Sequence, residues 1–396
     1  MTRYYKIVDF IRETFQEPTG FIPLHDPRFI GNERKYLTDV MDSNFVSSVG
    51  EYVGKFEQLC AQYTGVKYAV AAVNGTAALH MALIVAGVKA NEEVITQSVT
   101  FIATANAISY TGSYPVFIDV DKDTMGMSPE KLSDFLNKNC EVKADGFTYN
   151  KNTGRKIAAC LPMHTFGHPV RIDEIVTICD KFNIPCIEDA AESLGSTYKN
   201  RHTGSFGLLG TLSFNGNKII TTGGGGMILT NNEQLAKQAK HLTTQAKKPH
   251  KWEFVHDQIG YNYRLTNIAA ALGCAQIEQL PLFVEKKREL ALKYQSFFKN
   301  TDFDFFTELK EAKSNYWLNA LILKDLNERN EFLSYTNQND IMTRPLWELM
   351  TRLPMFKNCE KGNLDNSEWL ADRVVNLPSS VIIPGYKNNH TNPLTK

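Results

Sequence analysis

The sequence predicts an α/β protein with a mostly parallel sheet between helices, followed by a second, smaller domain. From about residue 52 to residue 230, helix-like stretches alternate with short apolar runs rich in β-branched residues, which is typical of a parallel sheet covered by helices. After Leu265 the pattern changes to long, charged amphipathic helices. The chain of 396 residues is 43% hydrophobic, so it can form a large core.

The composition favours a soluble protein without a broad charged surface. The 43 basic and 43 acidic residues balance, which argues against nucleic-acid binding. No apolar run approaches the roughly 20 residues of a membrane helix, and the N-terminal region lacks the apolar core of a secretory signal. We therefore expect a cytoplasmic protein that binds neither nucleic acid nor membrane. The 7 cysteines show no metal-binding spacing, so we expect reduced thiols and no metal site.

The strands expected in the large domain are short apolar runs with β-branched residues. They cover residues 68–73, 116–119, 157–162, 184–187 and 211–214. Several are followed by polar residues such as Asp119, His164 and Asp189. Ligands of open parallel sheets bind at the carboxyl ends of the strands, so we expect the chemistry there. The polar segment 141–155 is expected to be a hairpin inserted in this domain.

The second domain is expected to begin near Pro281. Residues 267–280 and 281–299 both have apolar residues at helical spacing. A strand at 316–323 and helices at 327–337 and 366–375 should follow. We expect the chain to divide into an N-terminal segment, a large domain, a small C-terminal domain and a disordered tail. These parts cover residues 1–20, 21–280, 281–386 and 387–396 respectively.

Residues 73–83 predict a strand end, a tight turn at Gly75 and an alanine-rich helix. The free N–H groups of the first helical turn and the helix dipole attract anions, so Gly75 and Thr76 are candidates for holding a phosphate. A buried helix preceded by a glycine is an equally good interpretation of this segment alone. The segment matches neither a Walker loop nor a G-x-G-x-x-G turn.

The segment 213–226 combines Ser213 at a strand end, Lys218 five residues later and four consecutive glycines. A lysine desolvated among apolar neighbours has a lowered pKa and can form a Schiff base with an aldehyde. Taken alone, the segment also fits a surface lysine in a flexible glycine loop.

Asp189 follows an apolar run, where an unpaired carboxylate is costly and tends to take up a proton. A cationic partner is therefore expected, and a protonated pyridine nitrogen fits, because such a ring withdraws electrons best. The alternative is that Asp189 caps a helix beginning at Ala190 and Ala191.

Five motifs occur together and in order in one known family. They are Asn74-Gly-Thr-Ala-Ala-Leu79, Thr100-Phe-Ile-Ala-Thr104, Glu188-Asp-Ala-Ala-Glu192, the Ser213 to Lys218 spacing and Gly260-Tyr-Asn-Tyr-Arg264. Over residues 21–378 the chain resembles the nucleotide-sugar aminotransferases of the DegT/DnrJ/EryC1/StrS type. The resemblance implies pyridoxal 5'-phosphate (PLP) as cofactor. It also implies the fold type I (aspartate aminotransferase-like) of PLP-dependent transferases, with a mostly parallel seven-stranded sheet and a smaller C-terminal α+β domain.

The resemblance also implies the roles of individual residues. Lys218 would bind the cofactor covalently and move protons, and Asp189 would pair with the pyridine nitrogen; these two are the catalytic residues. Phe101 would stack on the ring, and Asn262 would reach the phosphate from a second subunit, which implies a homodimer with shared active sites. Glu192 lies where many relatives carry a glutamine that contacts the cofactor. The cofactor-binding set is Gly75, Thr76, Phe101, Asp189, Glu192, Ser213, Lys218 and Asn262.

The substrate is implied by the C-terminal segments 343–347, 353–356 and 376–380. They look most like the LegC branch, which aminates a UDP-linked 4-keto-6-deoxy-N-acetylhexosamine, as in legionaminic acid or bacillosamine type biosynthesis for surface glycans. Glutamate is the expected amino donor. Arg264 and Arg344 are candidates for substrate binding, with surface ion pairs as the alternative.

Two other functions stay open. A PLP-dependent sugar dehydratase has the same fold, although the dehydratase relatives carry histidine in place of Lys218. A non-enzymatic regulator that binds PLP or a sugar nucleotide is disfavoured by the presence of both Lys218 and Asp189. We expect His80 and His164 to be structural rather than catalytic.

Overall fold

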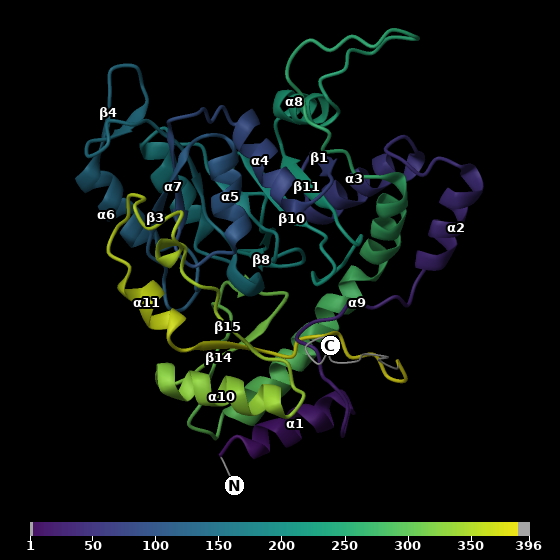
Figure 1. Ribbon diagram of the computed structural model, residues 1–396, viewed down its shortest axis with the longest axis vertical. Helices are drawn as coiled ribbons and strands as arrows, with labels where there is room; N and C mark the ends of the chain where they lie inside the picture. Colours follow the sequence, from purple (N-terminus) through teal and green to yellow (C-terminus); the bar gives the residue numbers. More distant parts are fainter. Residues whose placement is uncertain (1–2, 387–396) are drawn as a thin grey trace.

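The computed structural model describes residues 3–386, and a sheet forms the centre of its large domain (Figure 1). In spatial order the strands are β1 (Tyr68–Ala72), β11 (Gly226–Thr230), β10 (Leu209–Ser213), β7 (Ile187–Asp189), β6 (Ile157–Leu161), β2 (Glu93–Gln97) and β3 (Tyr114–Ile118). Parallel bridges from Cys160 to Cys186 and from Met163 to Asp189 join the β6 and β7 halves. The strand β11 runs antiparallel to both neighbours, whereas the other pairings are parallel. The predicted mostly parallel sheet between helices is therefore confirmed.

Most of the strands expected in the large domain are found within two residues of their predicted ends. The exception is the run 184–187, because the strand β7 begins only at Ile187. The strands β2 and β11 had no counterpart among the expected strands. The expected hairpin over 141–155 is present as β4 (Cys140–Val142) and β5 (Thr148–Asn150), which pair antiparallel.

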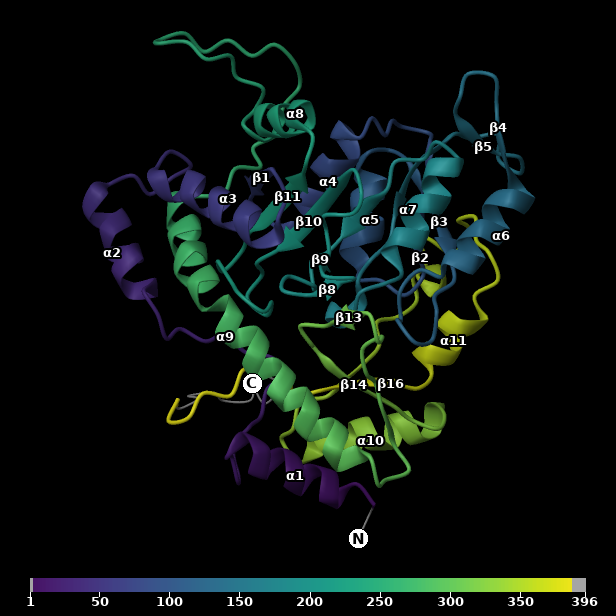
Figure 2. The ribbon, with the colours of Figure 1, turned by 180° about the vertical axis from the view of Figure 1, so that it is seen from behind.

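Helices pack on both faces of the sheet (Figures 1 and 2). The helix α4 (Gly75–Val85) is buried on almost every side, which its alanines permit, and it packs on β10 and β11. The other helices of this domain are α2 (Glu33–Ser43), α3 (Glu51–Thr64), α5 (Ile102–Tyr110), α6 (Pro129–Asn139), α7 (Ile172–Lys181) and α8 (Glu233–Thr243). Within residues 3–386, no helix is long and apolar enough to cross a membrane.

One long helix, α9 (Asn267–Phe298), links the two domains, as Figure 2 shows. We expected separate stretches meeting at Pro281, but the helix continues through this proline. The buried residues Ile277, Leu280 and Phe283 keep the helical spacing across it. Their burial offsets the roughly 3 kcal/mol that an interior proline costs. The predicted domain boundary near Pro281 stays a prediction and lies inside this helix.

The small domain is an antiparallel sheet covered by helices. Its strands follow the spatial order β12 (Asp304–Phe305), β14 (Asn319–Ile322), β16 (Val374–Leu377) and β15 (Arg344–Pro345). The helix α10 (Leu326–Gln338), the end of α9 and the N-terminal helix α1 (Tyr5–Phe15) share an apolar cluster with this sheet. The N-terminal segment therefore packs on the small domain.

Two further expectations concern the C-terminal region. The helix expected at 366–375 is wrong in extent. A shorter helix, α11 (Asp365–Ala371), is followed by β16, because Val374, Val375 and Leu377 are fully buried as a sheet strand. The predicted disordered tail, residues 387–396, lies outside the described residues.

Candidate active site

A cavity of about 320 Å³ lies where β7 and β10 end and where α4 and α5 begin. This is the edge at which ligands of parallel sheets bind. The cavity brings together most of the predicted site residues, which come from distant parts of the chain. Its lining includes Gly75, Thr76, Phe101, Asp189, Glu192, Ser213 and Lys218.

The start of α4 forms the anion-binding end of this cavity. The Asn74 side chain caps the helix by accepting a hydrogen bond from the Ala77 N–H at 2.8 Å. A Cβ on Gly75 would lie 2.8 Å from the Ser213 Cβ, so only glycine lets the serine approach the helix this closely. Backbone N–H groups of the first helical turn and the hydroxyls of Thr76 and Ser213 are thereby collected at the positive end of a helix dipole. This donor set fits a phosphate monoester.

Asp189 is a buried carboxylate at the end of β7, with 2% of its surface exposed. Its Oδ2 accepts a hydrogen bond from the Thr104 hydroxyl at 2.7 Å, and its Oδ1 accepts one from the Ala191 N–H at 3.1 Å. Burial raises the pKa of Asp189, and these two hydrogen bonds oppose the shift only in part. The helix-capping alternative is wrong, because a turn rather than a helix follows. A cationic ligand group in the cavity would stabilise the ionised carboxylate.

Lys218 lies opposite, with its side chain only 12% exposed. Its Nζ is 3.0 Å from the Glu192 Oε1 and 3.9 Å from the centre of the Trp317 indole. The surface-lysine alternative is therefore wrong. The other Glu192 oxygen accepts a hydrogen bond from the Phe166 N–H at 2.9 Å. Burial raises the pKa of Glu192 to about 7, although the nearby Lys218 opposes this shift.

Aromatic side chains form the walls of the cavity. Phe101 precedes α5, remains 47% exposed and contacts Trp347 edge to face, with ring centres 6.0 Å apart. The Trp317 indole N–H donates to the Asn217 carbonyl at 2.7 Å, which fixes the ring beside Lys218. Sequence reasoning assigned no role to either tryptophan. Trp347 stood in a motif already singled out, whereas no local pattern marked Trp317.

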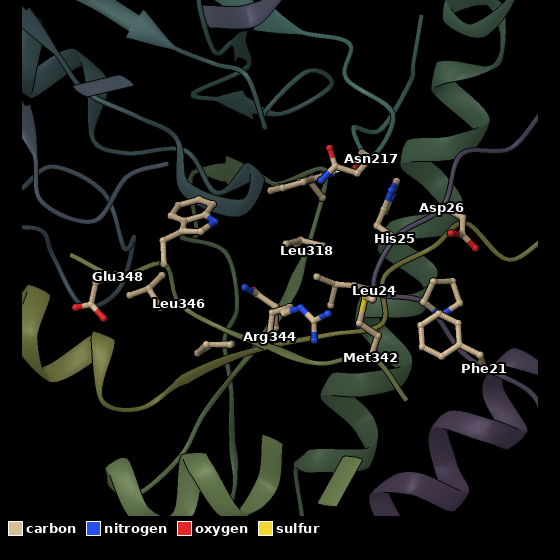
Figure 3. A pocket seen from close by; sticks show the side chains of 15 residues that line it. Phe21, Leu24, His25, Asp26, Asn217, Leu318, Met342, Arg344, Leu346 and Glu348 are labelled. Carbon is tan, nitrogen blue, oxygen red and sulfur yellow. Dashed lines mark hydrogen bonds between the residues drawn. The ribbon is translucent and has the colours of Figure 1, made fainter. Parts of the chain in front are cut away.

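A second cavity, of about 760 Å³, adjoins the first and shares Asn217, Trp317 and Trp347 with it (Figure 3). Arg344 lies in its middle, between Leu346 and Met342. The Arg344 guanidinium donates to the Asn337 Oδ1 at 3.2 Å and to the Thr343 carbonyl at 3.0 Å. Neither partner is a carboxylate, so this cation remains available to an anionic ligand.

Asn262 and Arg264 do not line either cavity. Asn262 is exposed. The segment nevertheless runs beside the anion-binding end, because the Tyr263 carbonyl accepts a hydrogen bond from the Val73 N–H at 2.8 Å. Within its own chain, Asn262 thus lies near the cavity without reaching it.

The two histidines expected to be structural lie in structural contacts. A ring nitrogen of His80 is 3.1 Å from the Tyr263 hydroxyl. His164 lies 3.0 Å from Glu188, whose carboxylate also accepts three backbone N–H groups at 2.6–2.7 Å. Glu188 is therefore held by the fold and faces neither cavity.

The chain is similar to known proteins along most of its length. A model of the DegT/DnrJ/EryC1/StrS aminotransferase family matches residues 28–386. The chain is 38% identical over 360 residues to a GDP-perosamine synthase of Escherichia coli O157:H7, a match that covers 91% of this chain and 93% of that protein. It is 40% identical over 336 residues to the putative pyridoxal phosphate-dependent aminotransferase EpsN of Bacillus subtilis (strain 168), covering 85% of this chain and 84% of the relative.

A solved structure has the same fold. The crystal structure of the aminotransferase TlmJ from Streptoalloteichus hindustanus matches with a TM-score of 0.82 and 25% sequence identity. The match covers 91% of this chain and 94% of the other.

Proposed function

Because the chain belongs to the DegT/DnrJ/EryC1/StrS aminotransferase family, we propose that it transfers the amino group of glutamate to C4 of a nucleotide-linked 4-keto-6-deoxy sugar. The protein is a PLP-dependent sugar aminotransferase. One observation carries the finer proposal. The cavity that holds Lys218, Asp189 and the start of α4 opens beside a larger cavity that contains Arg344, whose hydrogen-bond acceptors within residues 3–386 are uncharged.

The smaller cavity suits PLP in its donor set. When bound, PLP supplies an aldehyde that an amine can join and a ring that withdraws electrons. The start of α4, with Gly75, Thr76 and Ser213, is suited to its phosphate. Phe101 is suited to cover the ring. The Asp189 carboxylate is suited to keep a proton on the ring nitrogen, which in turn keeps this buried carboxylate ionised.

Proton transfer is the task of Lys218. Its Nζ takes the α-proton of glutamate in the first half reaction and returns a proton to C4 of the sugar in the second. Glu192, 3.0 Å away, holds Nζ in position. Since its pKa is about 7, Glu192 also accepts or releases a proton near neutral pH. The indole of Trp317 shields this amine from water on one side.

UDP is the proposed nucleotide, supported by the LegC-like segments 343–347, 353–356 and 376–380. GDP is the second candidate, favoured by the name of the E. coli relative, which specifies a GDP-linked product. In either case Arg344 is suited to the diphosphate, because its planar donors match phosphate oxygens.

We further propose a cytoplasmic homodimer with shared active sites. Asn262 belongs to the motif expected to hold the phosphate, yet it does not line the cavity of its own chain. The preceding segment, residues 247–259, extends away from the body of the molecule after α8 (Figure 1). It exposes Trp252, Phe254 and Ile259 by 74–85%. Three large apolar side chains exposed in one short projecting segment support an interaction surface there, and a second copy of the chain is the proposed partner.

Three measurements test the proposal. Glutamate added to the PLP-loaded enzyme should shift the visible absorption band, and no shift would exclude an aminotransferase. The enzyme whose cofactor has received the amino group of glutamate should then be tested with a panel of UDP-, GDP- and dTDP-linked 4-keto sugars. A clear preference by kcat/KM for GDP or dTDP sugars would exclude UDP while the aminotransferase function stands. Mass spectrometry of the product distinguishes amination from the loss of oxygen by a dehydratase.

A further inference from the structure

We propose that Asn376 and His25 form a subsite of the larger cavity that binds an uncharged polar substituent of the sugar ring, a hydroxyl or an amide. This inference rests on the proposed sugar substrate and adds to it the part of the protein that recognises the sugar itself. The two side chains come from distant parts of the chain, and both line the cavity that contains Arg344.

Asn376 is the first half of this subsite. It lies on β16, directly opposite Arg344 on β15. Only 2% of its surface is exposed, and among the described residues its carboxamide oxygen has no hydrogen-bond partner. A buried polar atom without a partner is rare and destabilising, because folding removes its hydrogen bonds with water and no protein hydrogen bond replaces them. A ligand that enters the cavity can supply the missing hydrogen bond.

His25 is the second half. Its ring extends towards Asn217, beside the loop that carries Lys218 (Figure 3). Neither ring nitrogen forms a hydrogen bond of normal geometry among the described residues, and both are hidden from bulk water. Burial, together with the positive charges of Lys287, Arg28 and Lys218, holds the pKa of His25 well below its usual value. The backbone of Asn217 still interacts with the ring, and this interaction raises the pKa of His25 but offsets the lowering only in part. The imidazole is therefore neutral at physiological pH.

The chemistry of both groups favours a sugar substituent over a phosphate. A neutral imidazole offers one donor and one acceptor, and a carboxamide also offers both. Hydroxyl and amide groups can satisfy both kinds, whereas a fully ionised phosphate only accepts and pairs best with cations. Arg344 supplies the cation for the diphosphate. Residues directly opposite in an antiparallel sheet have Cα atoms about 5 Å apart. A diphosphate bound to Arg344 would therefore place the attached sugar close to Asn376.

The first test uses Asn376→Leu, which has a similar size but no polar atoms. Binding is measured by calorimetry with the C4-alcohol analogue of the nucleotide sugar, which cannot be aminated. We expect about 10-fold to 100-fold weaker binding of the analogue, by loss of a buried hydrogen bond, and unchanged binding of free UDP or GDP. The melting temperature should not fall, because leucine removes an unpaired buried group. The inference would be overturned if Asn376→Leu bound the analogue with wild-type affinity, or if its affinity for the free nucleotide fell as much as its affinity for the analogue.

The second test uses His25→Ala, with His168→Gln as the matched control. His168 is also a buried histidine whose ring nitrogens have no partner among residues 3–386, but it lines neither cavity. In His25→Ala the half reaction with glutamate should proceed at the wild-type rate while KM for the keto sugar rises about 10-fold or more. The control should change neither half reaction. Equal slowing of both half reactions in His25→Ala would assign the residue to the fold instead.

The wild-type enzyme separates this inference from the proposed function. If it reacts with glutamate but with no keto sugar nucleotide, the proposed substrate is wrong. If the wild type reacts and both variants match it, the substrate stands and the subsite is wrong.

Discussion

At the scale of single residues, Asp189 and Glu192 line one cavity but have different partners. The Asp189 carboxylate accepts hydrogen bonds from a hydroxyl and a backbone N–H, and the residue lines the cavity. Glu192 instead contacts the Lys218 amine directly. The pKa of both is raised by burial, but only Asp189 lacks a cation within hydrogen-bond distance. This difference supports the proposal that Asp189 pairs with the ring nitrogen of the cofactor, while Glu192 pairs with Lys218.

The amine of Lys218 is expected to be essential. In Lys218→Ala, PLP should still bind through the other groups of the cavity but without a covalent link, and amino transfer should fall by several orders of magnitude. Absorption spectra and product formation measure the two effects. Lys237→Ala is the control, because Lys237 forms only a surface ion pair and is 75% exposed. Ordinary turnover by Lys218→Ala would refute the assignment.

The charge of Asp189 should matter more than its shape. In Asp189→Asn the amide oxygen can still accept from the Ala191 N–H, and the amide NH2 can donate to the Thr104 hydroxyl, which now accepts. The uncharged amide cannot keep the ring nitrogen protonated. We expect PLP to bind, and the half reaction with glutamate to slow by about two orders of magnitude or more. Rapid-mixing absorption measurements follow that half reaction. An unchanged rate would give this role to another residue.

Glu192 should make the stability of the cofactor-free protein depend on pH. Its pKa is about 7 in the folded protein, against an ordinary value of 4.5. Between these values the folded state binds more protons than the unfolded state, so this contribution to stability is lost as the pH rises. The free energy of unfolding of Glu192→Gln should therefore rise relative to that of the wild type between pH 4.5 and pH 7, by up to about 3 kcal/mol. Urea unfolding across this range tests it, and parallel curves for both proteins would contradict it.

At the scale of elements, the close contact between α4 and β10 shapes the anion-binding end. Gly75→Ala would drive a methyl group against Ser213, so we expect PLP affinity to fall about 10-fold while the fold persists. Gly54→Ala on α3 is the matched control, since a Cβ there meets nothing within 4 Å. That control should bind PLP normally and gain up to about 1 kcal/mol of stability. Fluorescence titration with PLP compares the two variants, and equal affinities would contradict the model of this contact.

The same scale shows what the sequence could and could not predict. Gly75, Asp189, Ser213 and Lys218 stand beside the predicted strand ends, and neighbouring strand ends of a parallel sheet meet at one edge. Their meeting in one cavity followed from local patterns together with the family resemblance. The strand β11 was missed because it begins at the last glycine of the glycine run. No local pattern predicts its antiparallel pairing with β1 and β10.

Arg344 was expected to bind substrate and Asn376 belongs to a segment already singled out, but the roles of the other small-domain residues that line the two cavities were beyond such reasoning. Trp317 lies beside Lys218 only because α9 and the sheet of the small domain bring it there. No local pattern gives Asn376 or His25 a hydrogen-bonding role, because the unpartnered oxygen of Asn376 and the buried ring nitrogens of His25 appear only after packing. Long-range packing, rather than local propensity, decides these positions.

At the scale of the whole molecule, the two cavities lie between the domains, yet one expected phosphate ligand remains outside. Asn262 is exposed beside the anion-binding end, and the apolar residues Trp252, Phe254 and Ile259 project nearby in the sequence. A two-fold dimer would bring the Asn262 of each chain to the partner's cavity, because two-fold symmetry makes both contacts equivalent. The complete site would then need both chains.

Mixing two inactive variants tests this arrangement. Lys218→Ala and Asn262→Ala should each be impaired alone. In a mixed dimer, the chain that retains Lys218 would receive Asn262 from its partner, so one of the two sites is intact. Random exchange makes about half of the dimers mixed, and about a quarter of the wild-type activity should return. Native mass spectrometry verifies the exchange. Exchange without recovered activity would assign Asn262 to the site of its own chain, and the exposed segment 247–259 would then need another partner.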